Sequence, residues 1–174
     1  MNHGPLNLPI QHIAYTCTDI REAVAFWTKE LKAGPFFLLD NITFERAEYE
    51  GGPVKYEHSA AFGQWGDIAV ELQQLHRIEP SGFREKIDRN LNHIAYVSAD
   101  AERDSAELER KGMPMYFEGL FEEVHVRFHD VPLLGHAIEL HQESGPVNEA
   151  FAQLVEAAEG WDGSDPLRMD WSES

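Results

Sequence analysis

The chain has 174 residues, 43% of them hydrophobic, which suits one folded domain and excludes a disordered segment. Its formal net charge of -17 repels phosphate backbones and anionic lipid headgroups, so we expect neither a nucleic-acid partner nor a membrane partner. No apolar run approaches the roughly 20 residues that span a bilayer, residues 1–8 lack the pattern of a signal peptide, and the single cysteine permits no internal disulfide, so a cytoplasmic location is expected.

The first predicted unit opens with a strand and a helix. Residues 9–17 alternate in polarity and are rich in Ile, Tyr and Thr, which is typical of a strand. Asp19 and Glu22 have the spacing of a capping box, and an apolar stripe of helical period follows them. Gly34 followed by Pro35 is expected to end this helix.

Three strand-like stretches complete this unit, at about 36–48, 54–63 and 67–76. Glycine-rich turns separate them. The predicted order is therefore βαβββ, in a first module that covers about 9–77.

A second module covers about 91–142 and repeats this order. The tetrapeptide HIAY begins at His12 and again at His93, each time ahead of an Asp and a helical stretch. The echo IAVEL at 68–72 and HAIEL at 136–140 closes each module. Four echoes in one order indicate a duplicated supersecondary unit and an α+β fold. Module one is longer, and we expect its extra residues to form a longer hairpin near 41–55.

The remaining segments are a linker at 78–90 and a C-terminal region at 146–174. Residues 146–160 have the pattern of one further amphipathic helix. The acidic residues of this region are interpreted as a solvated face or a loose end: Glu156, Glu159, Asp162, Asp165, Asp170 and Glu173.

Strand alternation predicts a metal site. In both modules the apolar strand residues share the face that should pack under the helix, so His12 and Glu71 share the opposite face, as do His93 and Glu139. A single strand His is more often a hydrogen-bonded core residue, and a single Glu is more often solvated. Their coincidence at matched places favours one divalent metal ion bound by all four side chains. Such ligands suit Zn, Ni, Co, Mn or Fe(II), and the sequence does not choose among them.

The other histidines rank below these ligands. His141 follows Glu139 on the same face and is expected to line a pocket or to make a simple hydrogen bond. His3 and His136 are interpreted as incidental, and Cys17 as a small buried hydrophobe. Exposure on an outer face is expected for the other strand histidines: His58, His76, His125 and His129.

The motifs resemble the vicinal oxygen chelate superfamily, which includes glyoxalase I, methylmalonyl-CoA epimerase, extradiol dioxygenases and bleomycin-resistance proteins. HIAYTCTD, a helix with Phe26-Trp27, the segment AGPF at 33–36 and the paired closing Glu carry the resemblance over about 9–142. It implies that residues 1–174 form a single glyoxalase-like domain, whose two βαβββ modules make a cupped mixed sheet around one metal site. The ligand places fall on His12, Glu71, His93 and Glu139, a set similar to that of glyoxalase I.

The resemblance also implies a homodimer. Apolar residues that one small domain would not fully bury point the same way: Phe36, Phe37, Phe117 and Phe121.

A chelated carbonyl defines the expected chemistry. A divalent ion that binds two neighbouring oxygens acidifies the adjacent C–H, and Glu139 or Glu71 is the candidate base. We therefore expect a metal-dependent isomerase, epimerase or lyase of glyoxalase type, acting on a small-molecule substrate. Three alternatives stay open: an Fe(II) extradiol-type dioxygenase, a small-molecule binding protein of the resistance type without turnover, and a metal with a structural role only. The last is the least favoured, because His/Glu sites with open positions suit chemistry better than closed thiolate sites do.

Overall fold

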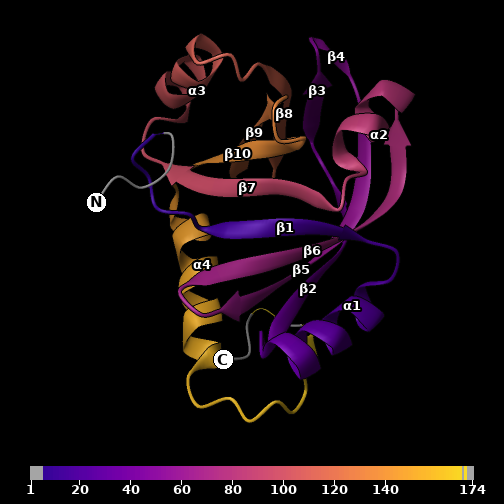
Figure 1. The fold of residues 1–174 in the computed structure, drawn as a ribbon, viewed down its shortest axis with the longest axis vertical. Helices are drawn as coiled ribbons and strands as arrows, with labels where there is room; N and C mark the ends of the chain where they lie inside the picture. Colours follow the sequence, from indigo (N-terminus) through magenta and orange to yellow (C-terminus); the bar gives the residue numbers. More distant parts are fainter. Residues whose placement is uncertain (1–5, 170, 172–174) are drawn as a thin grey trace.

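One continuous mixed sheet organises the molecule (Figure 1). The computed structural model describes residues 6–169 and 171, and over these residues eleven strands join the sheet while helices pack around it. The expected α+β class is confirmed. No helix in the described part of the chain is long and apolar enough to cross a membrane.

Module one has the predicted βαβββ order around its insertion. Its elements are β1 His12–Cys17, α1 Ile20–Phe26, a π-helical segment Trp27–Leu31, β2 Phe36–Thr43, β5 Lys55–Trp65 and β6 Ile68–Glu79. Module two repeats the order with β7 Leu91–Ser98, α3 Ala101–Arg110, β8 Met115–Phe121, β9 Val124–Val131 and β10 His136–Gln142.

The first helix begins as predicted and ends earlier than predicted. The Asp19 carboxylate accepts a hydrogen bond from the Glu22 amide at 3.0 Å, so the N-cap is confirmed. The helical segment ends at Leu31, because Lys32 adopts a left-handed conformation with φ of 59°. Gly34 has another role: a Cβ atom there would lie 2.9 Å from the ring of Trp161, so this glycine permits close approach of the C-terminal region.

The two modules meet at the centre of the sheet. The strand order is β11-β2-β5-β6-β1-β7-β10-β9-β8-β3-β4. β1 and β7 pair antiparallel at the centre, and each also pairs in parallel with the closing strand of its own module, β6 or β10. The four strands that carry the predicted ligands are therefore adjacent.

The insertion of module one lies on the edge of module two. β3 Arg46–Tyr49 pairs with β8, and β4 Gly52–Pro53 pairs with β3. Only two residues separate β2 from β3, although the two strands lie near opposite ends of the strand order. Two residues bridge at most about 11 Å between flanking Cα atoms, so the sheet must curl until its two edges approach each other. The hairpin expected near 41–55 is present as β3 and β4, but it pairs with β8 of module two and closes the cup.

Helices cover the outer side of the sheet. The α1 side chains Ile20 and Val24 pack on Val70 and Leu72 of β6, and α3 packs on β10 through Leu108. The linker contains a helix that was not predicted, α2 Ser81–Ile87, which buries Phe83 and Ile87. The apolar faces of β6 and β10 thus lie under the helices, as alternation predicted.

The phenylalanines that suggested a dimer pack within a single chain. Phe36 and Phe37 are 0% exposed and Phe117 is 1% exposed. Phe121 is half-buried and lines a pocket. The expectation that one domain would not fully bury these side chains is therefore wrong for Phe36, Phe37 and Phe117, and it holds for Phe121.

The C-terminal region packs against the sheet. α4 Gly145–Ala158 confirms the predicted helix, and β11 Leu167–Arg168 pairs in parallel with β2. Trp171 packs on Phe37 with ring centroids 5.2 Å apart, so the region is not a loose end. The four described acidic residues are exposed as expected: Glu156, Glu159, Asp162 and Asp165. Asp170 and Glu173 lie outside the described residues.

Candidate metal centre

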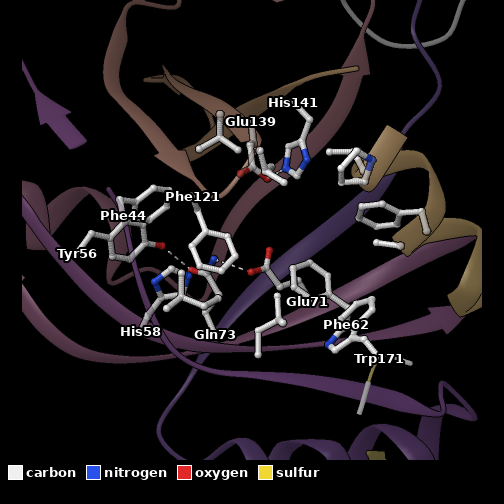
Figure 2. A pocket seen from close by; sticks show the side chains of 18 of the residues that line it. Phe44, Tyr56, His58, Phe62, Glu71, Gln73, Phe121, Glu139, His141 and Trp171 are labelled. Atoms are coloured by element: carbon white, nitrogen blue, oxygen red, sulfur yellow. Dashed lines mark hydrogen bonds and ion pairs between the residues drawn. The ribbon is translucent and has the colours of Figure 1, made fainter. Parts of the chain in front are cut away.

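A pocket lies inside the curled sheet (Figure 2). Glu71 of β6 and Glu139 of β10 reach into it. α4 and Trp171 form part of its wall. Most of the remaining lining is apolar, and its aromatic members are Phe44, Tyr56, Phe62, Phe121, Phe128, Phe151 and Trp171.

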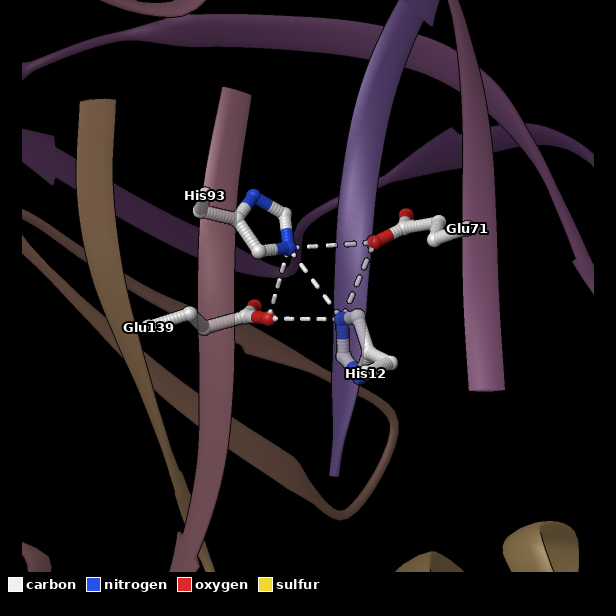
Figure 3. A group of neighbouring side chains, drawn as sticks. All are labelled: His12, Glu71, His93 and Glu139. Atoms are coloured by element: carbon white, nitrogen blue, oxygen red, sulfur yellow. Dashed lines mark hydrogen bonds and ion pairs between the residues drawn. The ribbon is translucent and has the colours of Figure 1, made fainter. Parts of the chain in front are cut away.

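Four side chains, two of which line this pocket, converge on one another (Figure 3). His12 and His93 come from the central strands β1 and β7, and Glu71 and Glu139 come from the strands beside them. One nitrogen or oxygen atom from each side chain lies within 4.8 Å of the other three. The structure thus brings together all four sequence-predicted site residues.

The separations between these atoms suit one metal ion. His12 Nε2 lies 3.2 Å from Glu71 Oε2 and 3.3 Å from Glu139 Oε2. His93 Nε2 lies 3.1 Å and 3.0 Å from the same two oxygens, and the two Nε2 atoms are 3.2 Å apart. With metal–ligand bonds of roughly 2.0–2.2 Å, adjacent ligand atoms lie about 2.8–3.6 Å apart. Two imidazole nitrogens and two carboxylate oxygens at these separations fit a divalent transition metal.

The charges of the cluster are coupled because all four side chains are buried. Burial alone would lower the pKa of His93, but Glu139 and Glu71 outweigh it and raise this pKa to about 10. Burial opposes the charge of Glu71 as well, yet contacts with His12 and His93 hold its pKa well below the usual range. Two buried carboxylates therefore require positive charge beside them. Protons on the imidazoles supply it, and a divalent ion in their place would supply it more directly.

The side-chain amide of Gln73 fixes the orientation of the Glu71 carboxylate. Gln73 Nε2 donates a hydrogen bond to Glu71 Oε1 at 2.8 Å, which leaves Oε2 facing the imidazoles. Gln73 Oε1 in turn accepts a hydrogen bond from the Tyr56 hydroxyl at 3.0 Å. Gln73 lies two residues after Glu71 on β6 and therefore on the same face of the sheet, but its contact with Glu71 was not predicted.

A second amide orients His93. His93 Nδ1 lies 3.0 Å from Asn92 Oδ1, so an Nδ1–H group donates there and the Nε2 lone pair faces the cluster. Asn92 is itself fixed by donation to the Ile87 carbonyl and to Gln73 Oε1. The sequence signal for this support is the polar residue next to the ligand on a buried strand.

The surroundings of His12 and Glu139 differ from those of Glu71 and His93. His12 Nδ1 has no hydrogen-bond partner in the described structure, and the His12 ring stacks on Phe151 of α4 with centroids 5.5 Å apart. His141 Nε2 lies 2.9 Å from Glu139 Oε2. His141 also lines the pocket, so both expectations for this residue are met.

His58 is a correction to the sequence interpretation. It was expected on an outer face, but it is 4% exposed and lines the pocket. Tyr56, His58 and Phe62 share one face of β5 by simple alternation, and all three line the pocket, so this face is the inner one; the bulge against β5 falls in β6, at His76. Burial lowers the pKa of His58 to about 4, so its imidazole is neutral near pH 7.

The remaining histidines lie outside the cluster. His129 is also corrected, since it is buried and contacts the Ser105 hydroxyl and the Met113 carbonyl. His76 is exposed as expected, His125 is half-buried beside Glu118, and His136 is buried beside the Ala137 carbonyl. His3 lies outside the described residues.

Cys17 is half-buried rather than fully buried. Its thiol donates to the Gln73 carbonyl at 3.4 Å, and burial raises its pKa to about 11. A thiol with a raised pKa is a weak nucleophile, so Cys17 carries no catalytic signature.

Comparison with known proteins relates this architecture to others. The model of the Glyoxalase/Bleomycin resistance protein/Dioxygenase superfamily matches residues 11–129. A hypothetical protein from Bacillus halodurans C-125 is 21% identical with a TM-score of 0.50, over 78% of this chain and 94% of that chain. A methylmalonyl-CoA epimerase from Mycobacterium tuberculosis is 15% identical with a TM-score of 0.48, over 86% and 97%. Likeness at these identities concerns the fold alone. Among curated proteins, none matches the chain significantly.

Proposed function

This chain belongs to the glyoxalase/bleomycin resistance protein/dioxygenase superfamily, and from that premise we propose that it is a divalent-metal-dependent isomerase, epimerase or lyase of glyoxalase type. It would remove a proton next to a carbonyl of a small molecule that chelates the metal through two neighbouring oxygens. His12, Glu71, His93 and Glu139 would hold the ion. The observation that carries the proposal is this four-atom cluster, whose two carboxylates also line the pocket.

The proposed reaction needs open coordination positions and a base. Four protein ligands leave up to two positions of a six-coordinate ion for substrate oxygens, and the pocket beside Glu71 and Glu139 gives access to them. A divalent ion held by these residues would polarise the carbonyl and make the adjacent C–H more acidic. The base then takes the proton from the adjacent carbon.

The surroundings of the two carboxylates support Glu139 as that base. Glu71 Oε1, the oxygen that does not face the histidines, accepts a hydrogen bond from Gln73 Nε2. This carboxylate therefore suits the role of a fixed ligand. Glu139 Oε2 lies among the histidines of the cluster, as Glu71 Oε2 does, but it also lies 2.9 Å from His141 Nε2, which can accept or return a proton. Both carboxylates were candidates from the sequence, and their partners distinguish them.

The cluster also bears on the dioxygenase alternative. An extradiol-type iron site uses two histidines and one carboxylate and keeps one face open for dioxygen and substrate. Glu71 Oε2 lies 3.2 Å and 3.1 Å from the two histidine nitrogens, at the place of a fourth ligand. A fourth ligand supports proton-transfer chemistry over dioxygen activation.

Matched carboxamide variants test the proposal. Glu139→Gln and Glu71→Gln each keep an oxygen ligand, so each should retain much of the metal. The assay is hydrogen–deuterium exchange beside the carbonyl of 2-hydroxycarbonyl and 2-oxo substrates, in the Zn, Ni, Co and Mn forms. Loss of a general base costs about 10²–10⁴ in rate, and we expect this loss in Glu139→Gln with a smaller loss in Glu71→Gln.

Two outcomes would contradict the proposal. Catechol-dependent oxygen uptake by the Fe(II) form without carbon–hydrogen exchange would favour the dioxygenase. Tight ligand binding with neither activity would favour the binding protein. Equal losses in the two variants would contradict only the assignment of the base.

We also propose a homodimer, as the family resemblance implies. Two apolar side chains at the β9–β10 turn, Leu133 and Leu134, are 92% and 68% exposed, which supports a further contact surface. Light scattering at high micromolar concentration should give twice the chain mass, and a monomer would contradict the proposal.

A further inference from the structure

The pocket beyond the metal ligands has no permanently charged cation among its described lining residues. Among the described residues that line it there is no Lys or Arg, and the charged members are Glu71 and Glu139. The chain as a whole carries a net charge of -17. A substrate that buries a phosphate or a second carboxylate here would meet like charge and find no cation to pair with.

The walls of the pocket suit a ring-sized apolar group. Phe44 and Phe121 contribute from the strand-rich side, and Phe62, Phe151 and Trp171 contribute from the side that α4 covers. Aromatic side chains bury large apolar areas and pack on rings in stacked or edge-on geometry. A small polar metabolite would not cover this apolar surface.

His58 is one of three polar lining residues that bond to none of the proposed metal ligands; the others are Tyr56, which bonds to Gln73, and Trp171. Gln73 and His141 bond to Glu71 and Glu139. The His58 ring stacks on Tyr56 with centroids 4.2 Å apart, and its Nδ1 atom is buried without a hydrogen-bond partner in the described structure. A buried polar atom that lacks a partner is costly unless a ligand or water satisfies it.

We propose that the substrate is an uncharged, largely apolar molecule. Its metal-binding end carries two neighbouring oxygens, its ring-sized tail lies among Phe44, Phe62 and Phe121, and a hydroxyl or carbonyl on the tail pairs with His58. This proposal rests on the proposed function for the metal-binding end, and it adds the chemistry of the tail. It excludes substrates carried on phosphate-bearing or carboxylate-bearing groups that enter the pocket.

Hydroxamates are suitable probes because they chelate a metal through two neighbouring oxygens without turnover. Calorimetry on the Zn-loaded protein would compare acetohydroxamate, benzohydroxamate and 4-carboxybenzohydroxamate. Burying the ring should tighten binding about 10- to 100-fold over acetohydroxamate. The added carboxylate should remove most of that gain. A ring that adds nothing, or a carboxylate that binds as well as the plain ring, would overturn the proposal.

Two matched substitutions test the charge argument directly. Phe121→Arg places a cation in the tail pocket, and Phe26→Arg places the same cation on the surface, where Phe26 is 56% exposed. Phe121→Arg should strengthen binding of 4-carboxybenzohydroxamate about threefold to tenfold and weaken that of benzohydroxamate. Phe26→Arg should change neither constant. Identical effects of the two variants would contradict a role for the pocket.

His58→Phe tests the polar contact. Among ring-hydroxylated benzohydroxamates, at least one isomer should bind the wild type about fivefold to tenfold tighter than it binds the variant, since one buried hydrogen bond is lost. Plain benzohydroxamate should bind both equally. If no hydroxylated isomer discriminates, the role of His58 is overturned while the apolar tail stands.

The experiment separates this inference from the proposed function. Absence of binding by every hydroxamate to metal-loaded protein would contradict the metal-binding end, and with it the proposed function. Ring-dependent binding without carbon–hydrogen exchange of any substrate would contradict the proposed reaction but support the apolar tail.

Discussion

Gln73 and Asn92 orient two side chains of the cluster by hydrogen bonds. Gln73 fixes one oxygen of Glu71, Asn92 fixes the Nδ1–H of His93, and the two amides bond to each other at 3.2 Å. A single buried network therefore orients Glu71 of module one and His93 of module two. Such partners set the direction of the lone pairs that a metal needs.

Gln73→Leu should weaken metal binding about 10- to 100-fold, because the free oxygen of Glu71 loses its donor. The measurement is competition with a chelator of known affinity. Gln74→Leu is the matched control, because the Gln74 side chain accepts a hydrogen bond from the Ile20 amide at the start of α1 instead. Equal metal affinity in the wild type and Gln73→Leu would contradict this positioning role.

His58 should make the fold sensitive to acid. Burial is the largest cause of its lowered pKa of about 4; Glu71 and Glu139 oppose the shift, while His93 and His76 add to it. An unfolded chain takes up a proton at this residue near pH 6.5, which the folded chain excludes. The stability is thus fully present above pH 6.5 and is lost as the pH falls toward 4.

We therefore predict that the wild type loses about 3 kcal/mol more than His58→Phe between pH 7 and pH 4. Denaturant unfolding of both metal-free proteins over this range measures the difference, in which titrations common to both cancel. A constant difference across the range would show that His58 titrates normally.

Corresponding helices of the two modules begin in the same way. Asp19 accepts from the Glu22 amide at the start of α1, and Asp100 accepts from the Arg103 amide at the start of α3. Both helices follow the first strand of their module and cover its closing strand. At the scale of elements the duplication therefore includes the cap as well as the ligands.

Asp19→Ala and Asp100→Ala should each lower the free energy of unfolding by about 1 kcal/mol, since each leaves a helix amide without its cap. The Asn variants keep an acceptor and should lose much less. Metal affinity should be unchanged in all four, because neither cap contacts the cluster. A cap substitution that abolished metal binding would contradict this separation of roles.

The curled sheet and the C-terminal region determine the pocket at the scale of the whole molecule. Strands of both modules supply the ligands, the insertion brings the edges together, and α4 with Trp171 covers one side. No single module contains the site. Metal binding should consequently stabilise the whole domain.

We predict close to one divalent metal ion per chain after reconstitution, by elemental analysis. At a free metal concentration 100 times the Kd, unfolding should cost about 2.7 kcal/mol more than in the metal-free protein, because the ion binds only the folded chain. A His12→Ala, His93→Ala double variant should lose this stabilisation. Reconstituted protein without transition metal would contradict the assignment of the cluster.

The sequence by itself determined the modules and the four converging side chains. Duplication is readable from repeated motifs, and alternation along a strand assigns each side chain to a face without knowledge of distant contacts. His12, Glu71, His93 and Glu139 obey that local rule, and the central pairing of β1 with β7 brings them together.

Only the tertiary structure decided the features that depend on distant pairing. The curled sheet encloses the face of β5 that carries His58, and pairing with β8 carried the insertion of module one to the edge of module two. The apolar walls come partly from α4 and Trp171, far along the chain from the ligands. Local sequence patterns determine on which face of a strand a side chain lies. The packing of segments distant in sequence determines which residues contact that face.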